Sequence, residues 1–488
     1  MLNSPNVHLI QFHDLLIVFD VNKNDIVLAS RDVFDSLRFM KENNMSCDEY
    51  ISLYKSSSVA NEILRFCSNG YFKSKRPQYI EHTGQKFYTY FLGKKMRKLI
   101  LQVTQDCNFR CSYCDYTCGS IDFHRSHSAT NMSWDVALKA LKFFKSHCQH
   151  QNKINISFYG GEPLLNYVLI QKCIEYVKKE FVGKDVSYNL TTNGSLLTME
   201  KALYLIDNNV NITVSIDGPE RVHNKNRKFA ANGRGTHRNV INNLRKIYVS
   251  YPEHYSKISF NCVVDPRLWN DDCNGFFSTD LFKNNHVIFS PMHPVNGRAV
   301  FYPDTFLAGQ KKAELSAAFK IIKQYEHPLN VESRYFFEEH MNMQKQMNLK
   351  SELPDVCGHS GPCMPGVHRL FVTVSGGLFP CEKANESSPI MNLGSVLTGL
   401  SENNARRMLN VTCVDAEKCR KCWGILHCNI CACSIDGGDE YSKTLMTKMC
   451  GQVLSQLERK IIREAIYKEF DKLRTLNCKL DYNEKILY

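Results

Sequence analysis

The sequence predicts an α/β protein whose central part is a partial (β/α)6 barrel of the TIM type. Between residues 98 and 290, six short apolar segments alternate with helical stretches, as in a parallel sheet flanked by helices. Three further apolar segments precede them, and ten of the 21 cysteines follow, between residues 357 and 450. Because 488 residues are too many for one core, we expect separate N-terminal and C-terminal domains around the barrel.

The N-terminal unit is predicted as a winged-helix-like domain over residues 5–85. Residues 7–12, 15–20 and 25–29 are predicted as three strands of a meander, because polar turn residues separate them. Apolar residues then recur at helical spacing between residues 31 and 68. The alternative is that this unit is only an N-terminal extension of the barrel.

The barrel is predicted over residues 95–320. Its expected strands are residues 98–104, 154–159, 186–191, 211–216, 257–264 and 286–290. A helix is expected over residues 133–148, with Ser133 able to cap its start. In such barrels the active groups lie on the loops that follow the strands. A helical linker (321–355), a Cys-rich domain (356–455) and a helical tail (456–488) are expected to follow.

Composition indicates a folded protein outside the membrane. Hydrophobic residues make up 43% of the chain, yet no stretch approaches the ~20 apolar residues of a membrane span. We therefore expect a cytoplasmic protein without a membrane partner, in which cysteines rarely form disulfides. The clustered cysteines then favour metal binding. The net charge of +12 favours an anionic partner, either nucleic acid or an acidic peptide.

The most informative motif is Cys107-x3-Cys111-x2-Cys114, which follows the first barrel strand. Three thiolates at this spacing can bind one iron–sulfur cube and leave one iron open, whereas closed clusters have four. The motif resembles the cluster loop of radical S-adenosylmethionine (SAM) enzymes. The resemblance implies a catalytic [4Fe–4S] cluster held by Cys107, Cys111 and Cys114, with Tyr113 close to SAM. In that family the open iron binds SAM, which is cleaved to a 5′-deoxyadenosyl radical.

Further motifs at the strand ends resemble the SAM-binding positions of the same family. Taken alone, Gly160-Gly161-Glu162-Pro163 is a turn whose glycines allow a small ligand to approach the backbone closely. One βα unit after the cysteine motif, it resembles the Gly-Gly-Glu-Pro motif that binds the SAM amino group. The resemblance extends to positions after the third and fourth strands and implies SAM contacts for Gly160, Gly161, Glu162, Asn193, Ser215 and Asp217. Val263 on the fifth strand is expected to line the adenine side of SAM. Arg227 is expected as a carboxylate partner, and a surface arginine is the alternative.

The C-terminal cysteines follow a second pattern. Cys357-x5-Cys363-x12-Gly376-x4-Cys381 precedes Cys419-x2-Cys422-x5-Cys428-x2-Cys431-x-Cys433 and then Cys450. The pattern resembles the SPASM domain of peptide-modifying radical SAM enzymes, which carries two auxiliary [4Fe–4S] clusters. The resemblance implies one cluster on Cys357, Cys363, Cys381 and either Cys431 or Cys433, and another on Cys419, Cys422, Cys428 and Cys450. Cys413 and Cys118 are surplus thiols, and zinc is the alternative metal.

The N-terminal unit resembles the peptide-recognition element of maturases that act on ribosomally made peptides. Arg125-x-His127 and Cys419-Arg420-Lys421-Cys422-Trp423 most resemble the Cys-rich-peptide maturases. The resemblance implies a thioether or related crosslink in a Cys-containing precursor peptide whose leader binds the N-terminal unit. It also implies a flavodoxin- or ferredoxin-type electron donor. A chain starting near Phe87 is expected to keep its clusters.

Two other functions stay open. An anaerobic sulfatase-maturing-type enzyme would share the clusters, but it would not need an N-terminal recognition unit. A zinc-bearing nucleic-acid-binding protein would suit the basic charge. The sequence has neither zinc-finger spacing nor an Arg-rich helix, so we expect no nucleic-acid partner.

Overall fold

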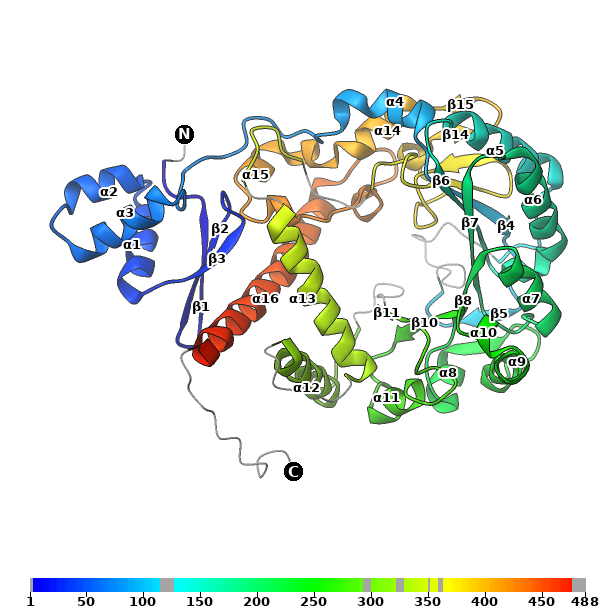
Figure 1. The fold of residues 1–488 in the computed structure, drawn as a ribbon. Helices are drawn as coiled ribbons and strands as arrows, with labels where there is room; N and C mark the ends of the chain where they lie inside the picture. Colours follow the sequence, from blue (N-terminus) through cyan, green and yellow to red (C-terminus); the bar gives the residue numbers. More distant parts are fainter. Residues whose placement is uncertain are drawn as a thin grey trace.

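A parallel sheet forms the centre of the computed structural model (Figure 1), which describes residues 3–114, 127–292, 300–321, 329–349, 352–358 and 363–475. Six strands lie side by side in chain order, and every neighbouring pair is parallel. They are β4 (Lys98–Thr104), β6 (Lys153–Gly160), β7 (Asp185–Thr192), β8 (Val210–Ser215), β10 (Ser259–Val264) and β11 (Val287–Pro291). The predicted α/β barrel fold is confirmed.

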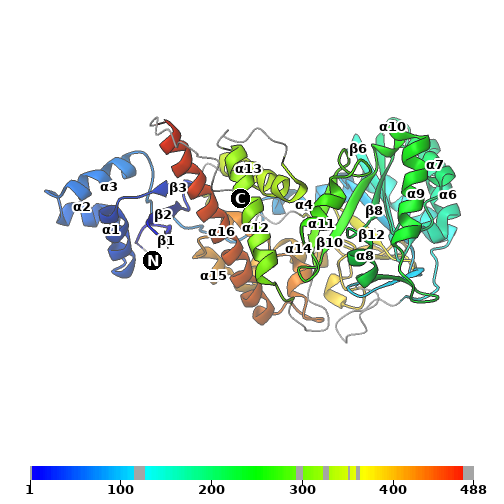
Figure 2. The same ribbon diagram turned by 90° about the horizontal axis from the view of Figure 1, so that it is seen from below.

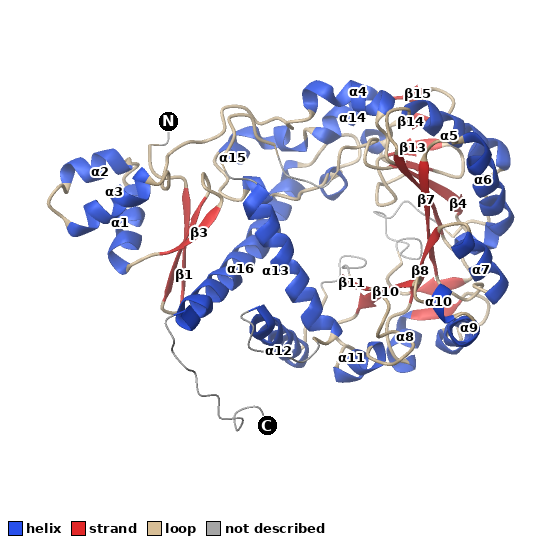
Figure 3. Cartoon of the chain, viewed as in Figure 1, coloured by secondary structure: helices blue, strands red, loops and turns tan. Residues whose placement is uncertain are grey.

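Helices cover the convex side of this sheet (Figure 3). Ser133 accepts a hydrogen bond from the Val136 N–H and so caps α5, as the sequence predicts. The apolar face of α5 is fully buried against the sheet at Ala137, Ala140 and Phe144. The helices of the barrel are α5 (Trp134–His147), α6 (Tyr167–Glu180), α7 (Met199–Asp207), α8 (Glu220–Asn226), α9 (His237–Ser250), α10 (Pro252–Tyr255) and α11 (Asp271–Phe277).

The Cys-rich part continues the barrel sheet. β12 (Leu370–Val372) pairs parallel with β4, with Leu370 opposite Leu99. β13 (Gly377–Phe379), β14 (Gly394–Ser395) and β15 (Gly399–Leu400) follow as antiparallel neighbours, which completes a ten-stranded sheet. These strands have only two or three residues, too few for a periodic pattern, so the sequence did not reveal them. The short helices α14 (Glu402–Leu409) and α15 (Ala416–Arg420) lie in the same part.

The N-terminal unit is an antiparallel meander covered by helices. Its strands are β1 (Val7–Phe12), β2 (Leu15–Asp20) and β3 (Asp25–Leu28), and its helices are α1 (Arg31–Glu42), α2 (Cys47–Leu53) and α3 (Ser58–Ser68). Alternate residues of β2 face opposite sides. Val18 packs in the core beneath the helices, whereas Ile17 and Phe19 belong to the main core of the barrel and the Cys-rich part. The meander is therefore buried on both faces.

Long C-terminal helices tie these parts together (Figure 2). Arg463 on α16 (Lys443–Thr475) bonds to Glu314 on α12 (Asp304–Ile321) at 3.0 Å and to Glu339 on α13 (Val331–Leu349) at 2.6 Å. Further along α16, Lys468 donates to the Ile26 carbonyl of β3 at 2.8 Å. The linker between the N-terminal unit and the barrel carries α4 (Tyr88–Lys94). Among the described helices, none is long and apolar enough to cross a membrane.

Candidate active site and cysteine groups

Cys107, Cys111 and Cys114 lie together on the loop that follows β4. Cys107 and Cys111 are each 9% exposed. Burial raises the pKa of the Cys107 thiol to about 12, and the neighbouring Cys111 and Cys114 thiols contribute to the rise. β5 (Phe109–Cys111) pairs with β9 (Arg227–Phe229), which places Arg227 directly opposite Cys111. The structure thus brings the three predicted ligands together beside a guanidinium group.

The two glycines at the end of β6 are required by the cysteine loop itself. Gly160 has a φ of +146°, and a Cβ atom there would lie 2.1 Å from the Thr104 carbonyl oxygen. A Cβ at Gly161 would lie 2.2 Å from the Asp106 carbonyl oxygen and 2.9 Å from Cβ of Cys107. Any larger side chain would push the loop away. The sequence predicted close approach of a small ligand, and the structure shows close approach of the loop.

Glu162 holds two neighbouring loops in place. Its side chain is fully buried and accepts hydrogen bonds from the Leu164 N–H (3.0 Å), the Thr192 hydroxyl (2.7 Å) and the Asn193 N–H (2.7 Å). Burial raises the pKa of the Glu162 carboxyl, and these three donors oppose the rise. Its own N–H donates to the Asp106 carbonyl at 2.8 Å. Glu162 therefore joins the loop after β7 to the cysteine loop.

Asn193 completes that connection. Its amide donates to Asn108 Oδ1 at 2.8 Å and lies 3.9 Å from the Cys107 sulfur. The Ser195 hydroxyl donates back to Asn193 Oδ1 at 2.7 Å, which fixes the orientation of the amide. The predicted residue after β7 is thus in contact with a predicted cluster ligand.

Asp217 and Arg227 form a buried ion pair at the carboxyl end of β8. The Asp217 carboxylate accepts from Arg227 Nε at 2.9 Å and Nη2 at 3.1 Å. It also accepts from the Val263 N–H at 3.1 Å and from the Tyr113 hydroxyl. Burial raises the pKa of Cys111 to about 11, and Arg227 opposes that rise, partly through a hydrogen bond to the thiol. Ser215, also predicted here, ends β8 and is 8% exposed.

Sequence reasoning missed His223, which hydrogen-bonds to the backbone of Asp217 and so helps to hold this ion pair in place. Its Nδ1 accepts from the Asp217 N–H at 3.3 Å, and its Nε2 lies 2.9 Å from the Thr236 hydroxyl. Burial lowers the pKa of His223 well below its ordinary value, so the ring is neutral. The only signal in the sequence was its position six residues after Asp217, within the next helix.

Four cysteines of the Cys-rich part form a first group. The Cys433 thiol hydrogen-bonds to both Cys381 and Cys431, and Cys363 is an electrostatic neighbour of Cys381 and Cys431. The hydrogen bond from Cys433 lowers the pKa of Cys431 to about 6. Both thiols between which the sequence could not choose therefore lie in this group.

Cys419, Cys422, Cys428 and Cys450 form the second group. Burial raises the pKa of Cys419 to about 12, and the other three thiols contribute to the rise. Cys357, predicted with the first group, contributes electrostatically to the raised pKa of the Cys428 thiol in the second group.

The exposed Cys413 donates to the Ile80 carbonyl at 3.0 Å. Cys118 and Arg125 lie outside the described residues. Burial lowers the pKa of His127, two residues after Arg125, to about 4.

Among the residues that the structure describes, no three His, Cys, Asp or Glu side chains converge closely enough to hold a single metal ion. A four-iron cube carries its thiolates on different iron atoms, which sets them farther apart than the ligands of one ion. The absence of such a site therefore concerns single metal ions and not four-iron clusters.

Comparison with known proteins identifies the barrel. Residues 101–266 match the family model of the radical SAM superfamily. This segment is a radical SAM domain. It contains the three-cysteine loop, the glycine pair and the Asp217–Arg227 pair. The radical SAM superfamily implies a [4Fe–4S] cluster and SAM.

Similarity to individual proteins extends beyond this radical SAM domain. The radical SAM cyclopropyl synthase TigE of Paramaledivibacter caminithermalis is 23% identical over 419 residues, which cover 82% of each chain. A cysteine-type anaerobic sulfatase-maturating enzyme of Clostridium novyi is 24% identical over 298 residues, or 59% of this chain and 74% of that protein. The structure of anSMEcpe with bound AdoMet and the Cp18Cys peptide superposes with a TM-score of 0.56 at 19% identity. It covers 76% of this chain and 98% of that chain, and shows the shared fold. The chain thus contains a radical SAM domain and is similar to a radical SAM cyclopropyl synthase and to anaerobic sulfatase-maturating enzymes.

Proposed function

We propose that this chain is a radical SAM maturase that installs a thioether crosslink in a ribosomally synthesised, Cys-containing precursor peptide. The observation that carries the proposal is the N-terminal unit, a meander with helices whose second face is buried against the Cys-rich part. A separate small unit next to a radical SAM barrel suits an enzyme that must hold a leader peptide while modifying another segment. Similarity to TigE extends over 82% of both chains, which supports an enzyme with a similar overall domain organisation.

The residues of the barrel fit the cofactors that the family implies. Cys107, Cys111 and Cys114 supply three soft thiolate ligands at one loop, as a [4Fe–4S] cluster with one open iron requires. Cluster and SAM, when bound, would supply a 5′-deoxyadenosyl radical that removes a hydrogen atom from the peptide. Glu162 and Asn193 hold the loop in place from one side, and the Asp217–Arg227 pair holds it from the other.

The auxiliary sites are proposed at the two cysteine groups, with an electron donor of the flavodoxin or ferredoxin type outside the chain. The first site would take Cys357, Cys363, Cys381 and either Cys431 or Cys433, and the second would take Cys419, Cys422, Cys428 and Cys450. Thioether formation removes one carbon-bound hydrogen atom, one thiol proton and one electron from the peptide, while a C–S bond forms. Soft thiolate groups near the barrel are suitable sites for redox centres.

The test is anaerobic incubation of the enzyme, SAM and reductant with a short Cys-containing peptide encoded next to this reading frame. Mass spectrometry should show loss of two hydrogens, and iodoacetamide should label one thiol fewer in the product than in the substrate. Loss of two hydrogens with all thiols still labelled would instead indicate a carbon–carbon bond, the bond type in the name of TigE. An unmodified peptide beside normal 5′-deoxyadenosine formation would refute this substrate class.

A sulfatase-maturing-type activity is the second candidate, favoured by the similarity to the Clostridium novyi enzyme. The same incubation with a sulfatase-derived Cys peptide distinguishes the two candidates. Conversion of that peptide, with no dependence on the N-terminal unit, would favour the sulfatase-maturing activity.

A further inference from the structure

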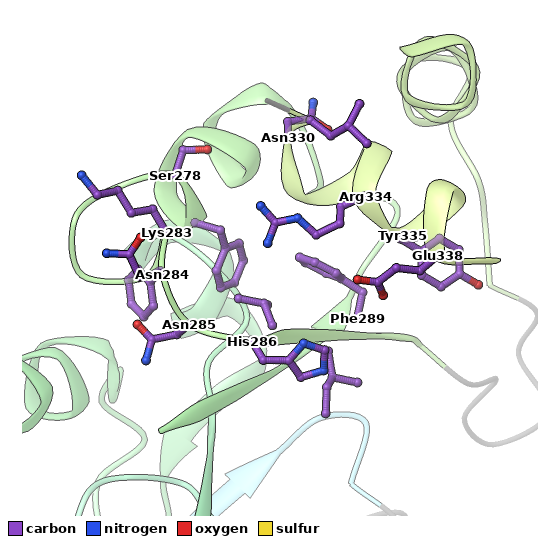
Figure 4. Close-up of a pocket in the computed structure, with 15 residues that line it drawn as sticks. Ser278, Lys283, Asn284, Asn285, His286, Phe289, Asn330, Arg334, Tyr335 and Glu338 are labelled. Atoms are coloured by element: carbon purple, nitrogen blue, oxygen red, sulfur yellow. The ribbon is translucent and has the colours of Figure 1, made fainter. Parts of the chain in front are cut away.

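Two cavities lie along β11, the last strand of the barrel sheet. The larger has a volume of about 560 Å³ and lies between the start of β11 and α13 (Figure 4). The smaller, about 200 Å³, lies at the carboxyl ends of β10 and β11 beneath α12 and α13. Phe289 and Tyr335 line both cavities, so the two are neighbours along the outer side of one strand.

Within the part of the chain that the structure describes, the outer edge of β11 carries backbone groups without hydrogen-bond partners. Within the described chain, β11 pairs with β10 only. The His286 carbonyl accepts from the Phe260 N–H at 2.8 Å, and the Met292 N–H donates to the Val264 carbonyl at 3.1 Å. The backbone N–H and C=O groups of the even-numbered residues therefore point toward β10. Those of Val287 and Phe289 point away from β10, toward the outer edge. Such an edge is a template for another extended chain.

The larger cavity contains a cation that has no ion-pair partner among the described residues. The Arg334 guanidinium extends from α13 into the cavity, and no described side chain forms an ion pair with it (Figure 4). Of the other charged groups there, Lys283 is paired with Asp280 at 2.5 Å, and Glu338 stands one turn along α13 from Arg334. His286 lies at the strand side of the cavity. Arg334 therefore suits a carboxylate ligand.

The smaller cavity is aromatic and lies at the carboxyl end of β10. Its rings come from the barrel, from the two helices and from the segment just before α12: Trp269, Phe289, Tyr302, Phe306, Tyr335 and Phe336. Val264 also lines it and directly follows Val263, whose N–H donates to Asp217. The smaller cavity is therefore one residue along β10 from a backbone contact of the candidate SAM site.

We propose that the outer edge of β11 binds an extended segment of the peptide substrate as an added strand. Main-chain hydrogen bonds to Val287 and Phe289 supply affinity, a carboxylate side chain binds Arg334, and a large apolar side chain fills the aromatic cavity. β11 has five residues, so the added strand spans about five residues as well. The choice of a peptide as the ligand rests on the proposed function, and the inference adds where an extended segment of that peptide binds.

Binding to the full-length holoprotein tests the site without turnover. The probes are fluorescein-labelled hexapeptide pools with one Phe and one Asp, or one Phe and one Lys, in a background of Ser, Thr and Val, measured by anisotropy. Asp pools should bind at least tenfold more tightly than Lys pools, and Arg334→Glu should reverse the order. Lys345→Glu, at an exposed position on the same helix outside both cavities, should leave the order unchanged. Equal binding of both pools, or equal effects of the two substitutions, would overturn the proposal.

The strand geometry is tested with peptides N-methylated at single positions. Methylation at alternate residues should weaken binding at least tenfold, and methylation at the residues between should have little effect, because only every second N–H faces β11. A uniform effect along the peptide would overturn strand addition. Formation of 5′-deoxyadenosine by the same holoprotein without peptide is measured in parallel. Loss of this activity would count against the proposed function, and not against the binding site at β11.

Discussion

The imidazole of His8 stacks on the indole of Trp423, with ring centroids 3.8 Å apart and planes 1° from parallel. His8 lies on β1, and Trp423 directly follows Cys422 of the second cysteine group. Asn24, in the turn between β2 and β3, makes a second contact. Its Oδ1 atom lies 2.6 Å from Nε2 of His427, which is the residue before Cys428. The N-terminal sheet therefore contacts the loop that carries two predicted cluster ligands.

The first prediction follows from this contact. Deleting residues 1–85 should expose Trp423 and the core positions that Phe19 covers, so the truncated protein should lose iron from the second cysteine group. The packing argues against the expectation that a chain starting near Phe87 keeps its clusters. His8→Ala should lower the free energy of unfolding by about 1 kcal/mol through the lost ring pair. His13→Asn, at the exposed β1–β2 turn, serves as the control. Full iron content in the truncated protein would contradict this prediction.

The second prediction concerns the radical site. Three cubes amount to about twelve irons per chain, so replacing Cys107, Cys111 and Cys114 together with Ala should remove about a third of the iron. SAM cleavage should be abolished, as measured by 5′-deoxyadenosine under reducing conditions. Cys413→Ser changes an exposed thiol outside both groups and should keep the full iron content. Continued SAM cleavage by the triple variant would show that the radical site lies elsewhere.

The third prediction addresses the first cysteine group. We expect Cys431→Ala to lose iron and Cys433→Ala to keep it, because the sequence around Cys431 resembles the Cys-rich-peptide maturases. The Cys433 thiol hydrogen-bonds to both Cys381 and Cys431, so the two candidate thiols lie side by side. The variant that carries both Cys431→Ala and Cys433→Ala is therefore the informative control. Iron loss in Cys433→Ala alone would move the ligand to Cys433. Cys357→Ala measures separately which group depends on that thiol.

The sequence predicted the barrel well and its long-range contacts poorly. Each barrel strand is a local apolar run, so its position could be inferred within one or two residues. The contact of Asp217 with Arg227 depends on β9, a three-residue strand with no periodic pattern. The docking of His8 on Trp423 joins residues more than four hundred positions apart, and nothing local to either residue indicates it. The cysteine motifs were visible because their ligands are close in sequence.

The fourth prediction tests the buried pair beside the cysteine loop. Arg227→Met should lower the free energy of unfolding by about 3–5 kcal/mol, because it leaves the Asp217 carboxylate buried without its cation. Adding Asp217→Asn should recover much of that stability, while SAM binding measured by calorimetry should stay weak. Arg238→Met breaks a surface pair with Glu220, and its effect should stay below about 1 kcal/mol. Equal losses in the two Arg variants would refute a special role for the buried pair.

The last prediction concerns pH and His223. Burial lowers the pKa of this ring well below 6.5, so the folded state keeps it neutral while the unfolded state takes up a proton below that pH. Its contribution to stability is therefore complete at neutral pH and is lost as the pH falls below 6.5. At pH 5.5 the loss should be about 1.4 kcal/mol relative to neutral pH. His223→Gln keeps a donor and an acceptor for Thr236 and Asp217 but cannot take up this proton. Urea unfolding at pH 7.5 and 5.5 should therefore show a smaller difference for the variant than for the natural protein. An equal pH dependence in both proteins would mean that other groups govern acid unfolding.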